Sequence, residues 1–198
     1  MYQIVDNFFE DPYEVRQIGL NLLAEKHSCI LNDFGGNYPG IRCLCPNYIH
    51  EFILNFLKKT YDLKIKWFIC CFHLTSSIHK LGLIHTDDEQ YSGLIYLNEN
   101  PKEHSGTILC NPIADVNTVE CNDPLYAGSS TNDIKTIKEF IDYKEQFNKN
   151  FQIELEIENK FNRFIFYEGA SHYHAPYYYF GNNLFNSRLV LVFWFYLM

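Results

Sequence analysis

Long apolar runs and an excess of positive charge are both missing from this sequence of 198 residues. No stretch approaches the roughly 18 apolar residues that a membrane-spanning helix needs. The opening segment, MYQIVDNFFEDP, is acidic where a signal peptide is basic. Lys and Arg total 16 against 24 Asp and Glu, which gives a formal net charge of -8. Because phosphate backbones and anionic lipids repel a net acidic surface, neither nucleic acid nor a membrane is an expected partner, and we expect a soluble, cytoplasmic protein.

Paired cysteine motifs are missing as well. The sequence has seven cysteines but no CxxC spacing, and neither Cys43-x-Cys45 nor the vicinal pair Cys70-Cys71 matches the usual zinc-ligand patterns. None of the cysteines lies in a recognisable nucleophile motif. An odd number of cysteines without such motifs favours reduced, mostly buried thiols.

Aromatic residues, by contrast, are abundant. The chain contains 17 Phe and 15 Tyr, and hydrophobic residues make up 47% of it. Rings of this kind favour strands and supply large buried surfaces. The length fits one domain, which we place over residues 1–198.

Residues 1–62 are predicted to form a helical support. Asp11-Pro12-Tyr13-Glu14 has the features of a helix start, with Asp as the N-cap, Pro at the first helical position and Glu completing a capping box. A second helix is predicted after Ile41-Arg42, because apolar residues recur there at the spacing of one helix face. These residues are Ile49, Phe52, Ile53, Phe56 and Leu57.

The rest of the chain has the pattern of successive short strands separated by turns, which is typical of an antiparallel sandwich or barrel. Residues 111–150 interrupt this pattern and are predicted to be an insertion between strands, with a helix that starts at Asn132 or Asp133. The predicted strands cover residues 64–74, 91–98, 105–110, 151–158, 163–167 and 187–197.

The sequence LIHTDDEQYSGLIYLN contains the clearest candidate for a metal site. Side chains alternate faces in an extended segment, so His85 and Asp87 point the same way and Asp88 points the opposite way. A second histidine follows much later, at His172 or His174. Two imidazoles and one carboxylate on one side of a metal are typical of non-heme Fe(II) oxygenases. Three further histidines, His73, His79 and His104, are expected in the core, in loops or on the surface.

At this point the chain resembles 2-oxoglutarate- and Fe(II)-dependent oxygenases of the prolyl-4-hydroxylase-like kind. Their pattern is His-x-Asp, a Tyr-Leu-Asn strand, a Gly-Thr strand, a distal His and a downstream basic residue. The resemblance covers residues 75–198, and the first half agrees more loosely. It implies a mostly β fold with flanking helices, namely a double-stranded β-helix, also called a jelly roll or cupin-like fold. The matching elements are His85-Thr86-Asp87, Tyr96-Leu97-Asn98, Ser105-Gly106-Thr107, His174 and Arg188.

The resemblance also implies residue roles. His85, Asp87 and the distal His would hold Fe(II), and 2-oxoglutarate and dioxygen would take the remaining positions. Arg188 would pair with the remote carboxylate of 2-oxoglutarate, and Tyr96 would donate a second hydrogen bond to it. Ascorbate is compatible with this chemistry as a reductant.

The distal histidine stays open between two residues. His172 and His174 share strand parity, so alternation does not separate them. The layout of the family favours His174, with His172 as the alternative. Between the distal His and Arg188, the run Tyr177-Tyr178-Tyr179 is a candidate aromatic wall over the substrate.

The implied activity is hydroxylation coupled to decarboxylation of 2-oxoglutarate to succinate. The sequence does not identify the substrate, and we expect a peptidyl side chain or a small metabolite. Repair dioxygenases that act on nucleic acid carry a second Arg six residues after the first, whereas position 194 here is Trp. The alternative is a non-catalytic jelly-roll module that binds a metal or ligand. The sequence does not indicate an oligomeric state.

Overall fold

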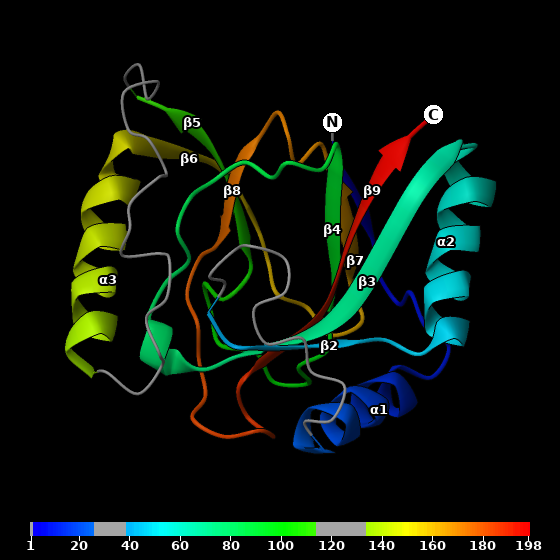
Figure 1. Cartoon of the computed structure of the whole chain (residues 1–198), viewed down its shortest axis with the longest axis horizontal. Helices are drawn as coiled ribbons and strands as arrows, with labels where there is room; N and C mark the ends of the chain where they lie inside the picture. Colours follow the sequence, from blue (N-terminus) through cyan, green and yellow to red (C-terminus); the bar gives the residue numbers. More distant parts are fainter. Residues whose placement is uncertain (1, 26–38, 114–133) are drawn as a thin grey trace.

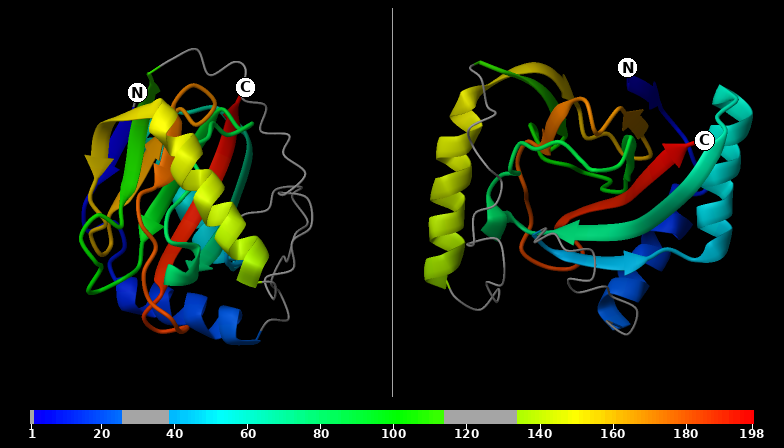
Figure 2. Two further views of the ribbon diagram at one scale, coloured as in Figure 1. Left: turned by 90° about the vertical axis from the view of Figure 1, so that its left-hand side faces the viewer. Right: turned by 45° about the horizontal axis from the view of Figure 1, so that its top comes forward.

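The computed structural model describes residues 2–25, 39–113 and 134–198 (Figure 1). Their strands form two antiparallel sheets that face each other (Figure 2). The larger sheet has six strands in the order β1-β7-β4-β9-β3-β2, and the smaller has three in the order β6-β5-β8. The strand bounds are β1 Tyr2–Val5, β2 Ile41–Leu44, β3 Ile65–Thr75, β4 Tyr91–Tyr96, β5 Thr107–Pro112, β6 Phe151–Ile157, β7 Phe164–Tyr167, β8 Tyr173–Pro176 and β9 Arg188–Leu197.

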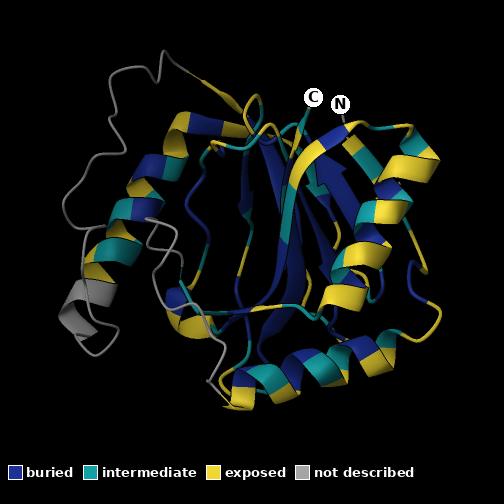
Figure 3. Ribbon diagram, turned by 45° about the vertical axis from the view of Figure 1, so that its right-hand side comes forward, coloured by how far each residue is buried: buried dark blue, intermediate teal, exposed yellow. Residues whose placement is uncertain are grey.

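Two helices, α1 (Pro12–Glu25) and α2 (Asn47–Tyr61), cover one face of the larger sheet (Figure 3). The backbone N–H of Glu14 donates to the Asp11 carboxylate at 2.9 Å, so the predicted N-cap is confirmed. The core beneath the helices is largely aromatic, and its rings stack or meet edge to face. Its central rings are Phe8, Phe72, Phe164, Phe166, Phe193 and Phe195.

The opposite face of the larger sheet packs against the smaller sheet. Strand alternation sends Val190 and Val192 of β9 to this side, while Leu191 and Phe193 face the helices. Leu109 of β5 contributes from the smaller sheet. The two packed sheets with flanking helices confirm the predicted jelly roll.

The third helix, α3 (Ile134–Phe147), lies on the side of the molecule opposite α2 (Figure 1). It falls between β5 and β6 in the chain, within the segment predicted to be an insertion. The Nζ atom of Lys144 donates to the carbonyls of His79 and Leu81, each at 2.6 Å, and so fixes α3 to the loop before the candidate metal site. The predicted helix start at Asn132 or Asp133 lies outside the described residues.

Two local features differ from what the sequence predicts. The helix predicted after Ile41-Arg42 is present as α2, but the sequence did not predict that residues 41–44 form β2, which pairs with β3 before α2 begins. The thiols were expected to be reduced, but the Cys43 sulfur is part of a disulfide, whereas Cys45, Cys70, Cys71 and Cys110 are free. Among the described residues, no helix combines the length and apolar character needed to cross a membrane.

Candidate metal centre

The backbone brings the two halves of the candidate site together. His85 lies in the extended segment before β4, and His174 lies on β8 of the smaller sheet. They form an isolated antiparallel bridge, in which the His85 N–H donates to the His174 carbonyl at 3.0 Å and the His174 N–H donates to the His85 carbonyl at 2.8 Å. This bridge places the two imidazole centroids 4.6 Å apart.

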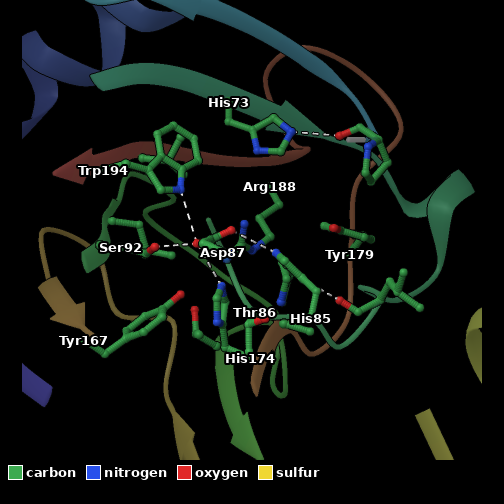
Figure 4. Close-up of a pocket in the computed structure, with 18 of the residues that line it drawn as sticks. His73, His85, Thr86, Asp87, Ser92, Tyr167, His174, Tyr179, Arg188 and Trp194 are labelled. Atoms are coloured by element: carbon green, nitrogen blue, oxygen red, sulfur yellow. Dashed lines mark hydrogen bonds and ion pairs between the residues drawn. The ribbon is translucent and has the colours of Figure 1, made fainter. Parts of the chain in front are cut away.

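Asp87 completes a compact group of three potential ligands (Figure 4). Its Oδ1 lies 3.3 Å from His85 Nε2, and its Oδ2 lies 3.2 Å from His174 Nε2. One ligand atom from each residue fits within 4.8 Å of the others, and the described part of the chain contains no other such group. Asp87 is buried and Asp88 is exposed, as the alternation of side chains predicts.

Both imidazoles are held in the orientation that a metal ligand needs. Nδ1 of His85 lies 2.8 Å from the Leu83 carbonyl, and Nδ1 of His174 lies 2.8 Å from the His172 carbonyl. A carbonyl oxygen only accepts hydrogen bonds, so each Nδ1 must carry a proton. Each Nε2 is therefore the atom that faces Asp87 and is able to bind a metal.

The charges at this group stabilise one another. Burial alone would raise the pKa of Asp87, but hydrogen bonds and charge interactions with His174 and His85 outweigh it and lower that pKa below its usual range. Burial alone would lower the pKa of His85, but the Asp87 carboxylate outweighs it and raises that pKa. Without a metal, the group is therefore a buried carboxylate between two imidazoles, and its negative charge favours the protonated form of His85.

Oδ2 of Asp87 is engaged by two further donors. The Ser92 hydroxyl donates to Oδ2, and the Trp194 indole N–H donates to it at 3.3 Å. Gly169 lies against this arrangement, and its carbonyl accepts the Asp87 N–H at 3.1 Å. A Cβ at position 169 would lie 2.1 Å from Ser92 Oγ, so only glycine fits there. These contacts leave Oδ1 as the carboxylate oxygen with the freer access to a metal.

The group opens into a cavity of about 240 Å³. Several cavity residues were not predicted from the sequence to be part of the site, because they come from distant strands. Examples are Arg42, Ser92, Tyr167 and Trp194. Only Tyr179 of the predicted tyrosine wall lines the cavity. Burial raises its pKa to about 12.

Arg188 lies in the same cavity at the start of β9 and is only 1% exposed. Its Nε donates to the Ser105 carbonyl at 3.1 Å, but Nη2 is buried and has no hydrogen-bond partner. No carboxylate of the described residues forms an ion pair with this guanidinium. A buried cation beside a cavity without a counter-ion is costly, and an anionic ligand would remove that cost.

Tyr96 does not line the cavity itself but contacts Thr107, which does. The Tyr96 hydroxyl donates to Thr107 Oγ1 at 2.8 Å. The Arg188 guanidinium carbon lies 5.7 Å from the centre of the Tyr96 ring. Any effect of the Tyr96 hydroxyl on a ligand in the cavity would therefore pass through Thr107.

The remaining histidines lie apart from the group. His172 is in the turn before β8, where its Nδ1 lies 3.2 Å from the Glu168 carbonyl. His73 lines the cavity, and burial lowers its pKa well below the usual value. Burial lowers the pKa of His79 to about 4, and His104 is exposed beside Glu156. The prediction that His73, His79 and His104 lie in the core, in loops or on the surface, rather than among the ligands, agrees with these positions.

No family model matches the sequence, and no curated protein matches it either. Solved structures do match, each over 98% of this chain. A prolyl hydroxylase from Trichoplax adhaerens, solved with a hypoxia-inducible-factor peptide fragment, gives a TM-score of 0.59 at 13% identity and is covered over 83% of its length. A prolyl 4-hydroxylase from Pseudomonas putida matches with a TM-score of 0.52 at 13% identity, over 91% of its own length. A prolyl 4-hydroxylase from Phytophthora capsici matches with a TM-score of 0.54 at 12% identity, over 58% of its own length. This chain therefore has the fold of the prolyl 4-hydroxylases, as its sequence motifs indicated.

Proposed function

We propose that the protein is a 2-oxoglutarate- and Fe(II)-dependent oxygenase that hydroxylates a peptidyl side chain or a small metabolite. The observation that carries the proposal is the grouping of His85, Asp87 and His174, with both Nε2 atoms directed at one carboxylate, in the cavity that also contains Arg188.

The donor set fits the metal. Two imidazole nitrogens and one carboxylate oxygen suit Fe(II) and occupy one side of it, which leaves positions for other ligands. His85 and His174 would bind through Nε2, and Asp87 through Oδ1. When bound, Fe(II) together with 2-oxoglutarate and dioxygen supplies the oxidising power that replaces a C–H bond with C–OH and releases succinate and carbon dioxide. Ascorbate would serve as an accessory reductant.

Arg188 fits the cosubstrate. Its buried Nη2 lacks a partner, and a planar guanidinium matches the two oxygens of a carboxylate. The remote carboxylate of 2-oxoglutarate would supply the missing counter-charge. Thr107 lines the cavity close by and receives its hydrogen bond from Tyr96, so its own hydroxyl hydrogen is available to the same carboxylate.

The surroundings of the cavity support chemistry that must exclude bulk water. Tyr167, Tyr179 and Trp194 provide aromatic walls, and Ser92 with Trp194 hold Asp87 in one orientation. The acidic net charge and the presence of Trp194 six residues after Arg188 argue against a nucleic-acid substrate. The peptide bound to the Trichoplax enzyme is that enzyme's ligand, and its presence there makes a peptidyl substrate a reasonable first test.

An anaerobic titration tests the proposal directly. Metal-free protein receives Fe(II) and then 2-oxoglutarate, and we expect a visible charge-transfer band only when both are present. Admission of dioxygen should then produce succinate, slowly when no second substrate is supplied. His174→Ala should abolish Fe(II) binding, and His172→Ala, its matched control, should retain it.

The possible results separate three cases. A protein that neither binds nor consumes 2-oxoglutarate would contradict the proposal. Binding of metal and 2-oxoglutarate without succinate formation would instead support the alternative of a non-catalytic binding module. Loss of Fe(II) binding in His172→Ala, with retention in His174→Ala, would reverse the ligand assignment.

A further inference from the structure

Two thiols meet on the helix-covered face of the larger sheet. Cys45 directly follows β2, and Cys70 lies on the neighbouring strand β3. Their Sγ atoms are 2.6 Å apart, and the Cys45 N–H donates to the Cys70 carbonyl at 3.5 Å. Among the cysteines that the structure describes, no other two free thiols are recorded in contact.

The sheet register explains why these two cysteines meet. Leu44 pairs with Cys71, so the next residue along β2, Cys45, lies opposite Cys70. Strand alternation then separates the vicinal cysteines. Cys70 belongs to the core under the helices, which Cys45 also contacts, whereas Cys71 belongs to the core between the two sheets. Only Cys70 of the vicinal pair is therefore able to react with Cys45.

The two sulfurs are close to bonding distance. A disulfide has an S–S separation of about 2.05 Å and joins Cβ atoms about 3.8 Å apart, which is a separation that facing residues on adjacent antiparallel strands approach. The sulfurs need to move together by only about half an ångström. Cys45 is partly exposed, so a small oxidant reaches it, and Cys70 is buried next to it.

We propose that Cys45 and Cys70 form a modification site that a peroxide oxidises to a reversible intramolecular disulfide. The Cys45 sulfur attacks one oxygen of hydrogen peroxide, the O–O bond breaks, and the second oxygen leaves as water after it takes a proton. The Cys70 sulfur then displaces the hydroxyl group from the Cys45 sulfur as a second water. Overall, the two thiols lose two protons and two electrons, and one peroxide becomes two waters.

The disulfide would add a covalent link between β2 and β3, next to Cys43, which is itself part of a disulfide. Among the strands that the structure describes, β2 is an edge strand that pairs only with β3, and α2 begins at Asn47, two residues after Cys45. β2 also carries Arg42, whose guanidinium lies 5.0 Å from the centre of the Trp194 ring in the cavity. The bond would close a loop from residue 45 to residue 70 and so restrict the unfolded chain. We therefore expect the oxidised protein to be more stable.

Peptide mapping tests the site on the full chain. Protein that has been fully reduced and freed of metal with EDTA, so that iron does not decompose the peroxide, is treated with a small molar excess of hydrogen peroxide. Remaining thiols are then alkylated in denaturant. Trypsin releases Cys43–Lys58 and Trp67–Lys80, and we expect these peptides to appear joined, with a mass two hydrogens below their sum. Fragmentation between Cys70 and Cys71, and between Cys43 and Cys45, assigns the bond.

Variants and reversibility complete the test. Cys45→Ala should abolish the joined peptide, and Cys71→Ala, the matched control one residue from Cys70, should retain it. Because the Cys43 disulfide can re-form in both proteins, the test compares the two shifts: oxidation should raise the Tm of the wild type by about 5 to 15 °C more than that of Cys45→Ala, and dithiothreitol should reverse the difference. Alkylated Cys45 and Cys70 in peroxide-treated wild type, or a bond that maps to Cys71, would overturn the proposal. Neither result depends on Fe(II) or on 2-oxoglutarate.

Discussion

At the scale of single residues, Trp194 is expected to set the metal affinity without touching the metal. Its indole N–H donates to the Asp87 oxygen that faces His174, and it shares this oxygen with Ser92. Trp194→Phe keeps an aromatic ring but removes the donor, so Asp87 loses part of its fixed orientation. We expect the Kd for Fe(II), or for Co(II) as a stable substitute, to rise by about 10- to 100-fold.

The control for this change is Trp67→Phe. Trp67 is 39% exposed and packs against Tyr196, away from the cavity. Its replacement should leave the metal affinity unchanged. Equal affinity in Trp194→Phe and wild type, measured by anaerobic titration, would show that Ser92 alone is sufficient to orient Asp87.

Arg188 is expected to lower the stability of the ligand-free protein and to strengthen the binding of 2-oxoglutarate. Replacement by Met removes a buried charge that has no carboxylate partner among the described residues, so the metal-free, ligand-free protein should keep its Tm or gain a few degrees. The same change removes charge-assisted hydrogen bonds that contribute about 1.5 to 3 kcal/mol each. We expect the Kd for 2-oxoglutarate, measured calorimetrically with Co(II), to rise at least about tenfold.

Arg163→Met is the matched control, because Arg163 is paired with Asp6 at the surface. It should leave 2-oxoglutarate binding unchanged and lower the Tm slightly. A large loss of Tm in Arg188→Met without a change in 2-oxoglutarate affinity would mean that Arg188 has only a structural role.

At the scale of elements, the docking of α3 is expected to depend on pH through Lys144. Burial lowers the pKa of this ammonium to about 8 from an ordinary value of 10.5, and the neighbouring Glu145 opposes the shift only in part. Between pH 8 and 10.5 the unfolded chain therefore binds more protons at this position than the folded chain does. Stability from this group must then rise with pH across that window.

A comparison of melting temperatures isolates the effect. Lys144→Met removes the Nζ donor from the carbonyls of His79 and Leu81, of which the His79 carbonyl keeps only the Leu81 N–H, so it should be less stable than wild type at every pH. The Tm advantage of wild type over Lys144→Met should widen from pH 7.5 to pH 10. Lys149→Met, which removes an exposed lysine two residues after the end of α3, should show a constant difference.

Elements that the sequence predicts correctly are those with strong local signals. The Asp11 cap and the spacing of Ile49, Ile53 and Leu57 define α1 and α2 without reference to the rest of the chain. β2 and β8 are four residues each, and they exist because they pair with distant β3 and β5. Strands of that length are set by tertiary pairing more than by propensity.

The candidate site divides in the same way. His85 and Asp87 are predicted by their spacing within one extended segment. Such spacing does not decide between His172 and His174. The N–H groups of Ser171 and His172 both donate to the Glu168 carbonyl, so His172 lies in a turn and not in the strand that contains His174. Ser92 and Trp194 face each other as a cross-strand pair on β4 and β9, a register that the sequence alone does not reveal.

At the scale of the whole molecule, the candidate metal site is where the two sheets are joined. His85 and Asp87 precede β4 of the larger sheet, and His174 lies on β8 of the smaller one. Without a metal, the junction depends on the backbone bridge of His85 with His174 and on the hydrogen bond from the Asp87 N–H to Gly169. A metal bound by all three side chains would hold the same segments together and oppose their local separation.

Hydrogen exchange should therefore respond to metal in a restricted region. With saturating Co(II) under anaerobic conditions, we expect the amides of His85, Asp87 and His174 to exchange at least about tenfold more slowly than in the metal-free protein. A ligand present at 100 times its Kd contributes about 2.7 kcal/mol to the state that binds it, which permits a change of this size for amides that open locally. Amides of α2 and β1 lie away from the junction and should change only if they exchange through global unfolding. Uniform slowing across the chain would mean that the two sheets already open as one unit without metal, and no slowing at β8 would remove His174 from the metal site.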